Sequence, residues 1–468
     1  MFRSPALRLV LIFGLTLLVS PIANTQTRIP ELKFADRTLQ NGLRVLSVTD
    51  HSSPTVAIQV WYHVGSKDDP QHRSGFAHLF EHMMFKSTKN MKSEMMDRLT
   101  EDVGGFNNAF TADDVTVFYE VVPSNYLETL VWAEADRLAS LNVDETNFKS
   151  ERDVVKEEFR QSVLAPPNGR FEYLLQQKSF TQHPYQRPTI GSIEDLDAAS
   201  LKDVQEFHST YYRPDNATVV IVGDFDQKQL DAWIDKYFSP IPRPDRPLPR
   251  VETKEPMRKS ETRLVEYGTN DLPVVGLTYL TPRQADPDSD VLRVAGAILS
   301  GGESSRLYHS LVYQQQVAAE SEAVPEEKEN ASLFVLTAIL SEGKKPEDGE
   351  RAMLAEVAKM QDSPVSQQEL EKAKNQIITE QLRERETSDG KALALGQAVL
   401  LGDASRVNTD LQRLQSVSAA DVQRVMKKYL TANNRLVLYY LPQSMKKPSS
   451  ISQQTDKAPI SVEGGTDK

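Results

Sequence analysis

The sequence predicts an α+β protein built from two duplicated units of about two hundred residues each. A chain of 468 residues is longer than a single hydrophobic core usually supports. Strand-like and helix-like segments alternate along it. A short series of matching segments also occurs twice, in the same order, once in each half.

The matching series is an acidic residue, a tyrosine eight positions later, an asparagine and an apolar strand. It occurs at Asp203, Tyr211 and Asn216 before a strand at 217–222, and again at Asp421, Tyr429 and Asn434 before a strand at 436–441. The segment PTVAIQVWYHV from Pro54 likewise resembles PVVGLTYL from Pro273. Each match is short, but their shared order indicates a duplication.

The first unit begins with strands and continues mainly with helices. Alternating, β-branched stretches predict strands, and apolar residues at helical spacing predict helices. The predicted strands are 44–48, 56–63 and 115–122, and the apolar strand at 217–222 closes the unit. The predicted helices are a run from Ser74 and the ranges 93–103, 124–141 and 145–163, of which the second ends at Gly104 and Gly105.

Composition marks the two ends of the chain and the boundary between the units. The first 27 residues place Arg3 and Arg8 before an apolar stretch, the pattern of a secretory signal peptide. A retained membrane anchor is the alternative, but the apolar stretch is shorter than the ~20 residues that a span needs. A proline-rich passage predicts a linker, and a polar C-terminus predicts a disordered tail. The predicted boundaries are a signal peptide at 1–27, an N-terminal domain at 28–240, a linker at 241–260, a C-terminal domain at 261–442 and the tail at 443–468.

The composition also limits the function. Because the chain has no cysteine, it has no disulfides or thiol chemistry, and a metal site must use imidazole and carboxylate ligands. The net charge of −12 argues against nucleic acid as a partner and mildly favours basic substrates. No mature transmembrane span is expected. The leader predicts export, which means the periplasm if the source is a Gram-negative bacterium.

An H-x-x-E-H motif at 78 to 82 predicts a metal site. In a helix with Ser74 as its expected N-cap, His78 and His82 project from the same face and can share one ion. Glu81 stands beside them as a candidate base. A catalytic zinc site needs one more protein ligand and an open position for water.

A second, acidic helix is the natural source of that ligand. Glu151 and Glu158 lie seven residues apart, two helical turns, so both carboxylates share one face, whereas Glu157 points elsewhere. The alternative is that the histidines are unrelated and that the glutamates form an ordinary solvated helix face.

At these residues the sequence resembles the pitrilysin/insulinase family of zinc peptidases, which carries the inverted motif. The third ligand of that family is a glutamate about 76 residues beyond the second histidine, and Glu158 stands 76 residues after His82. A supporting glutamate seven residues earlier matches Glu151. Other matching segments are GSKDDP, GGFNNAFTADDVTVFYEVV, HPYQRPTIGSIEDL and FHSTYYRPDNATVVIVGD. The resemblance covers nearly the whole mature chain.

The resemblance implies a zinc-dependent endopeptidase that acts on peptides or unfolded segments. One Zn²⁺ would be held in the N-terminal domain by the ligands His78, His82 and Glu158, with Glu81 as the base and Glu151 as support. Each domain would be a mostly antiparallel sheet packed with helices, and the chain would form half of a clamshell around a chamber. Asn108 and Ala109 would lie on an edge strand that accepts the substrate as an added strand.

The second half departs from the single-chain members of the family. Those members carry an arginine and, seven residues later, a tyrosine that help to bind substrate, but Val312 and Ala319 occupy these places here. Arg306 and Tyr313 are also seven residues apart, but that register shifts the surrounding match. The resemblance therefore implies a heterodimer with a zinc-less homologous subunit that supplies the pair, with a homodimer as the alternative.

A non-catalytic role is the other function class that the sequence leaves open. The family includes assembly subunits that keep the fold and lose the metal, and a peptide-binding protein could use the same chamber without turnover. The intact motif and Glu158 argue against both.

Overall fold

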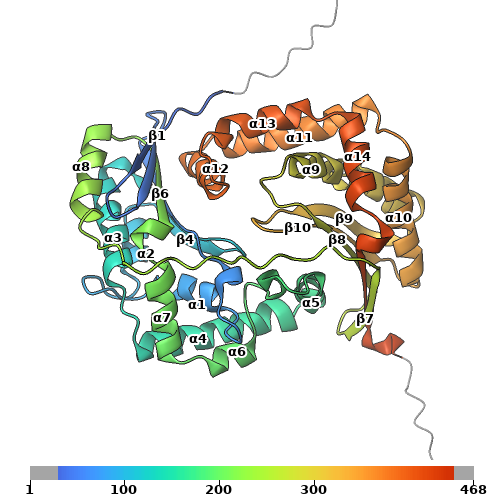
Figure 1. Ribbon diagram of the computed structural model, residues 1–468, viewed down its shortest axis with the longest axis horizontal. Coiled ribbons are helices and arrows are strands. Elements are labelled where there is room, and N and C mark those ends of the chain that lie inside the picture. Colours follow the sequence, from blue (N-terminus) through green and yellow to red (C-terminus); the bar gives the residue numbers. More distant parts are fainter. Residues whose placement is uncertain (1–29, 447–468) are drawn as a thin grey trace, which may run out of the picture. The chain divides into compact units, whose positions relative to one another are not determined.

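The computed structural model describes residues 30–446. The predicted signal peptide lies outside these residues, as does the predicted tail after a short 3₁₀ helix at Gln443–Met445. Two sheets, both flanked by helices, organise the described chain (Figure 1). The predicted α+β fold class is therefore confirmed.

The first sheet contains six strands and is antiparallel except where β2 and β6 run parallel. Its spatial order is β1 (Ala35–Thr38), β2 (Arg44–Thr49), β6 (Ala217–Gly223), β3 (Thr55–Tyr62), β5 (Thr116–Pro123) and β4 (Phe106–Thr111). β4 is thus an edge strand, paired on one side only.

The second sheet has five strands and is antiparallel except where β7 and β11 run parallel. Its spatial order is β7 (Thr262–Gly268), β11 (Arg435–Pro442), β8 (Val274–Thr281), β10 (Ser332–Leu340) and β9 (Ala318–Glu326). This order matches the first sheet without β1, so β9 stands in the place of β4. The topology supports the duplication inferred from sequence.

The aspartate and asparagine of the repeated series have equivalent structural roles in the two halves. Asp203 and Asp421 each complete a capping box at the start of a helix, α7 (Leu201–Tyr211) and α14 (Ala419–Tyr429). The amides of Asn216 and Asn434 donate to the backbone carbonyls at the ends of these helices, at 2.9 and 2.8 Å. The same bonds therefore join helix to strand twice.

The other helices are distributed over both halves. The first half contains α1 (Phe76–Met83), α2 (Met95–Glu101), α3 (Leu127–Ser140), α4 (Glu145–Phe159), α5 (Gly169–Ser179), α6 (Ile193–Ala198) and α8 (Gln227–Tyr237). The second contains α9 (Pro287–Ser300), α10 (Pro346–Asp362), α11 (Gln367–Glu384), α12 (Ser388–Leu400) and α13 (Arg406–Ser416). None of the helices between residues 30 and 446 is long and apolar enough to cross a membrane.

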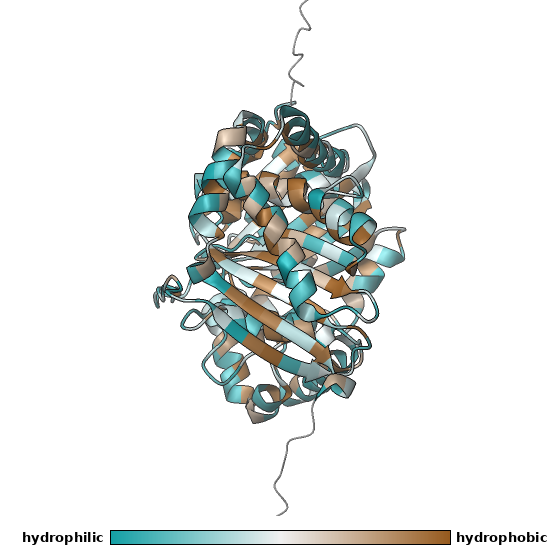
Figure 2. Cartoon of the chain, turned by 90° about the vertical axis from the view of Figure 1, so that its right-hand side faces the viewer, coloured by the Kyte–Doolittle hydropathy of each residue, from teal (hydrophilic) through white to brown (hydrophobic). Residues whose placement is uncertain are grey.

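Each half contributes one helix to the core of the other. One face of the first sheet packs on α1, α3, α7 and α8, whereas the opposite face, including Trp61 and Val117, is covered by Ala392 and Leu395 of α12. In return, Phe171 and Leu175 of α5 pack against the second sheet. Along the strands facing the viewer in Figure 2, hydrophobic residues alternate with hydrophilic ones, which fits sheets packed unequally on their two faces.

The predicted linker, 241–260, contains no helix or strand. The predicted domain boundaries themselves stay a prediction, because the two halves share their cores in this way.

Candidate metal centre

The motif helix α1 begins later than the sequence predicted. We expected Ser74 as the N-cap, but the helix starts at Phe76 and its N-cap is Gly75, in a left-handed conformation with φ of 95°. The carboxylate of Asp69 accepts hydrogen bonds from the backbone N–H groups of Gly75 and Ala77, at 2.7 and 2.9 Å. The expected cap was wrong because a loop carboxylate satisfies the first turn, while the Ser74 hydroxyl donates to Asp195 at 2.5 Å.

The packing of α1 directs both histidines to the same side. Phe76, Leu79, Phe80 and Met83 are buried in the core of the first half. The opposite face of the helix therefore presents His78 and His82, which lie one turn apart. Their rings meet nearly at right angles, 87°, with centroids 4.9 Å apart.

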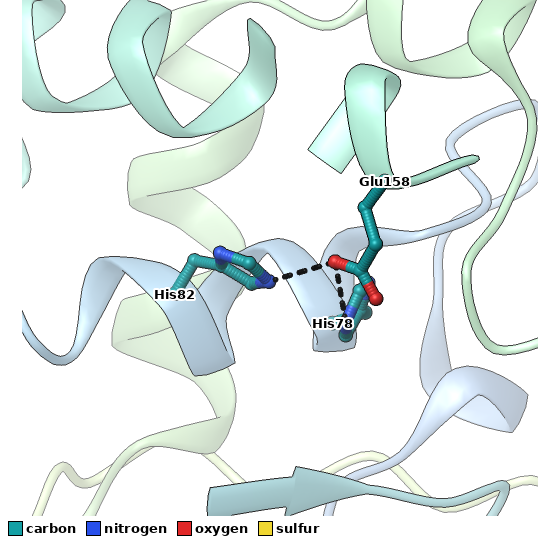
Figure 3. A group of neighbouring side chains, drawn as sticks. All are labelled: His78, His82 and Glu158. Atoms are coloured by element: carbon teal, nitrogen blue, oxygen red, sulfur yellow. Dashed lines mark ion pairs between the residues drawn. The ribbon is translucent and has the colours of Figure 1, made fainter. Parts of the chain in front are cut away.

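Glu158 lies at the end of α4, across from this face (Figure 3). Its Oε2 atom is 3.3 Å from Nε2 of His82 and 3.7 Å from Nε2 of His78. In the part of the chain that the structure describes, these three side chains form the group that could hold a metal ion, with ligand atoms within 4.8 Å of one another. His78 and His82, predicted from their spacing, and Glu158, implied by the family resemblance, therefore lie together.

Electrostatics favour the protonation state of a metal ligand at His78 and at Glu158, but not at His82. Burial lowers the pKa of His78 to about 4, so its ring is neutral near pH 7. The hydrogen bond with His82 lowers the pKa of Glu158, which keeps this carboxylate ionised. Burial acts to lower the pKa of His82 as well, but the carboxylate of Glu158 outweighs it and raises that pKa.

Glu81 lies on the same helix beside this group, but it is not one of its three members. Its Oε2 atom accepts a hydrogen bond of 2.6 Å from the hydroxyl of Thr111, at the end of β4. Burial raises the pKa of Glu81, and the bond with Thr111 opposes that shift. A carboxylate in this environment is a suitable proton acceptor.

Glu151 is buried behind the ligands, with 5% of its side chain exposed. Its Oε2 atom is 3.8 Å from Nδ1 of His82, and its Oε1 atom is 3.0 Å from the ammonium of Lys86. Glu157 is exposed and pairs with Arg160. The structure therefore places Glu151 beside a ligand and Glu157 away from the site, as the helical spacing predicted.

Asn108 and Ala109 lie on the edge strand β4, next to the motif helix in space. The side-chain oxygen of Asn108 accepts a hydrogen bond of 2.8 Å from the backbone N–H of Ala109. This strand has an unpaired side, which is the structural requirement for adding a peptide strand.

The second half contains no free arginine–tyrosine pair at the sequence positions considered. Val312 is half-buried, and Ala319 is exposed on β9. Arg306 forms a two-pronged ion pair with Glu369, at 2.8 and 3.1 Å. Tyr313 is 70% exposed and stacks on His309.

Sequence reasoning missed three residues at the site: Asp69, Lys86 and Thr111. Asp69 caps the motif helix, Lys86 pairs with Glu151, and Thr111 holds Glu81. No spacing rule identifies them, because each contact depends on how the loop, strand and helices pack.

Comparisons with known proteins show which proteins this chain resembles. Sequence models described as "Insulinase (Peptidase family M16)" and "Peptidase M16 inactive domain" match residues 44–192 and 198–377. The chain is 29% identical over 414 residues to the zinc protease PqqE of Helicobacter pylori, covering 88% of this chain and 93% of that protein. It is 24% identical over 406 residues to a probable mitochondrial-processing peptidase subunit beta of Arabidopsis thaliana, covering 84% and 75%.

The fold comparison gives the same result. The crystal structure of a protease from Helicobacter pylori has a TM-score of 0.85 and 28% identity, covering 88% of this chain and 99% of that chain. The chain belongs to the insulinase family, peptidase family M16. All the residues of the candidate metal centre lie within the first matched region.

Proposed function

We propose that this chain is a zinc-dependent endopeptidase. The observation that carries the proposal is the convergence of His78, His82 and Glu158 on one point, with the carboxylate of Glu81 beside it. The names of relatives, among them a zinc protease, support it.

The ligand geometry fits zinc. Two tetrahedral ligands with bonds of ~2.0–2.1 Å lie roughly 3.3–3.4 Å apart. The separations from Glu158 Oε2 are 3.3 and 3.7 Å, and all three ligand atoms lie within 4.8 Å of one another, so a small inward shift would bring them to that distance. Two imidazoles and one carboxylate are a donor set typical of catalytic zinc, with a fourth position left for water. Three protein ligands are therefore sufficient for this chemistry.

In the proposed mechanism, His78, His82 and Glu158 would hold a zinc ion, which would supply the Lewis acidity that lowers the pKa of a water molecule and polarises the scissile carbonyl. Glu81 accepts the proton of the attacking water and then donates it to the leaving amine. The free backbone edge of β4 aligns the substrate as an added strand. No covalent intermediate is needed.

We also propose that the active form is a pair of homologous chains, in which a zinc-less partner supplies an arginine and a tyrosine. Two observations support this: Val312 and Ala319 occupy the matching places, and Arg306 is already paired with Glu369. A relative whose name denotes a peptidase subunit is consistent with it. A homodimer that completes the site in another way is the alternative.

The test is cleavage of a panel of quenched fluorescent peptides by the purified chain, alone and mixed with a co-encoded homologue that lacks the motif. We expect cleavage that requires both chains, stops with chelator and returns with zinc. Glu81→Gln should lower kcat by roughly 10²–10⁴-fold while zinc content and peptide binding persist.

Glu157→Gln is the matched control, because this exposed glutamate lies on α4 one residue from a ligand. It should retain full activity. Zinc binding without cleavage in every mixture would contradict the peptidase proposal and favour a peptide-binding or assembly role. Full activity of the chain alone would contradict only the need for a partner.

A further inference from the structure

Thr111 joins the edge strand to the candidate base. Its hydroxyl donates to Glu81 Oε2 at 2.6 Å. Thr111 is the last residue of β4, and Glu81 is on α1, so this hydroxyl links the two elements.

The register of β4 shows which of its backbone groups are accessible. The hairpin closes with a bond from the N–H of Ala112 to the carbonyl of Val115. In an antiparallel pair, alternate residues bond to the neighbouring strand and the others face away. The backbone N–H and carbonyl groups of Asn107, Ala109 and Thr111 therefore point away from β5, towards the open edge of the sheet.

Both ends of this open side are already occupied. The N–H of Gly105 bonds to the carbonyl of Thr100, and the hydroxyl of Thr111 bonds to Glu81. Between these ends, the backbone groups of Asn107 and the carbonyl of Ala109 can pair with a peptide strand, whereas the N–H of Ala109 already donates to the side chain of Asn108. Thr111, two residues after Ala109, bonds to Glu81. The carboxylate of Glu81 thus lies at the end of the accessible edge.

We propose that Thr111 is a positioning residue, which fixes Glu81 relative to a peptide paired with Ala109 and so places the scissile bond beside the base. This inference rests on the proposed peptidase function. Thr111 does not need to contact the substrate for this role, because it acts through Glu81. It should therefore influence the chemical step more than substrate binding.

The test compares Thr111→Val and Thr111→Ser in the zinc-loaded protein with its homologous partner. The valine has the shape of threonine but lacks the hydroxyl, whereas serine keeps the hydroxyl. Loss of a hydrogen bond to a charged group should lower kcat roughly 10–100-fold, with KM changed less than about threefold. Thr111→Ser should stay within about threefold of the wild type.

Thr116→Val is the matched control. Thr116 is the cross-strand partner of Thr111, and its hydroxyl donates to the carbonyl of Val64 at 2.9 Å, away from Glu81. The Thr116→Val variant also loses one threonine hydroxyl from the β4–β5 hairpin. Its kcat should match that of the wild type once the folded fraction is taken into account.

A second readout does not depend on activity. In the metal-free protein, hydrogen–deuterium exchange of the segment 106–111 should be faster in Thr111→Val than in the wild type, because Glu81 is held less firmly. Equal exchange and equal kcat in Thr111→Val and the wild type would overturn the inference while leaving the peptidase proposal intact. A silent wild type would instead overturn the proposed function.

Discussion

His82 is held from both sides of its ring. Its Nε2 atom faces Glu158 at 3.3 Å, and its Nδ1 atom faces Glu151 at 3.8 Å. Lys86 in turn neutralises Glu151 at 3.0 Å. By contrast, Nδ1 of His78 is buried and has no hydrogen-bond partner among the described residues. The Nδ1 side of the His82 ring therefore faces a carboxylate that lies outside the candidate ligand group.

Glu151→Gln should weaken zinc binding roughly 10–100-fold, the usual effect of losing an outer partner of a ligand. The physical reason is that the neutral amide no longer increases the basicity of His82 and leaves Lys86 without its counter-charge. Competition with a chromophoric chelator measures the affinity. Asp153→Asn, at an exposed position on the same helix, should bind zinc like the wild type. Equal affinity in both variants would contradict this role of Glu151.

At the scale of elements, α12 approaches the first sheet closely at one glycine. A Cβ atom on Gly396 would lie 2.1 Å from Cε2 of Trp61, whose ring is buried. The indole N–H of Trp61 donates to Gln59, and Gln59 donates to Asp389 at the start of α12. The helix from the second half is therefore seated on the sheet by a steric fit and by a chain of hydrogen bonds.

Gly396→Ala should destabilise the protein by about 1–3 kcal/mol through overpacking, although alanine in a helix is favoured over glycine by about 1 kcal/mol. Chemical denaturation measures the free energy of unfolding. Gln397→Ala, at the exposed neighbouring position, should change it little. A stabilising effect of Gly396→Ala would mean that α12 does not pack against Trp61 in this way.

At the scale of the whole molecule, ionised side chains connect the two halves near the end of the β4–β5 hairpin. Lys67, only 3% exposed, pairs with Asp114 at 2.8 Å and with Glu329 of the second half. His63 also contacts Glu329, at 2.8 Å. Lys328 pairs with Asp113. Lys328 and Glu329 lie on the turn between β9 and β10. Their contacts anchor the β4–β5 hairpin, whose first strand ends at Thr111.

Glu329 makes the stability of this contact depend on pH. Burial tends to raise its pKa, but the bond with His63 and the charge of Lys67 prevail and lower it to about 2. A lowered pKa stabilises the folded state above the unfolded value of about 4.3, and this contribution is lost as pH falls towards 2. Because the side chain is one-third exposed, solvent reduces the effect to about 1–2 kcal/mol.

Glu329→Gln should therefore unfold more easily than the wild type at pH 7, and the difference should shrink as pH falls below about 4.3 and be largely lost at about pH 2. Urea denaturation at several pH values measures this. Glu342→Gln removes an exposed carboxylate elsewhere in the second half and should show no comparable difference. A difference between Glu329→Gln and the wild type that is independent of pH would exclude the ionic origin.

Much of the site followed from local spacing. His78 and His82 share a helix face because they are four residues apart, and Glu151 and Glu158 share another because they are seven apart. Long-range contacts were not accessible in this way. The capping of α1 by Asp69 and the bond from Thr111 to Glu81 join elements whose approach depends on the packed core.

The sequence by itself determined the α+β class, the duplicated order of strands and helices, and the family to which the chain belongs. The class and the duplication follow from periodicity and from the order of short matching segments, whereas the family follows from the resemblance of the motif at 78 to 82 and the matching segments around it. Only the tertiary structure decided that α5 and α12 pack on the opposite sheets, that Arg306 is neutralised by Glu369, and that the accessible edge of β4 ends at Glu81. Such contacts join residues far apart in the chain, and burial of apolar surface and pairing of charge select them only when the whole chain folds.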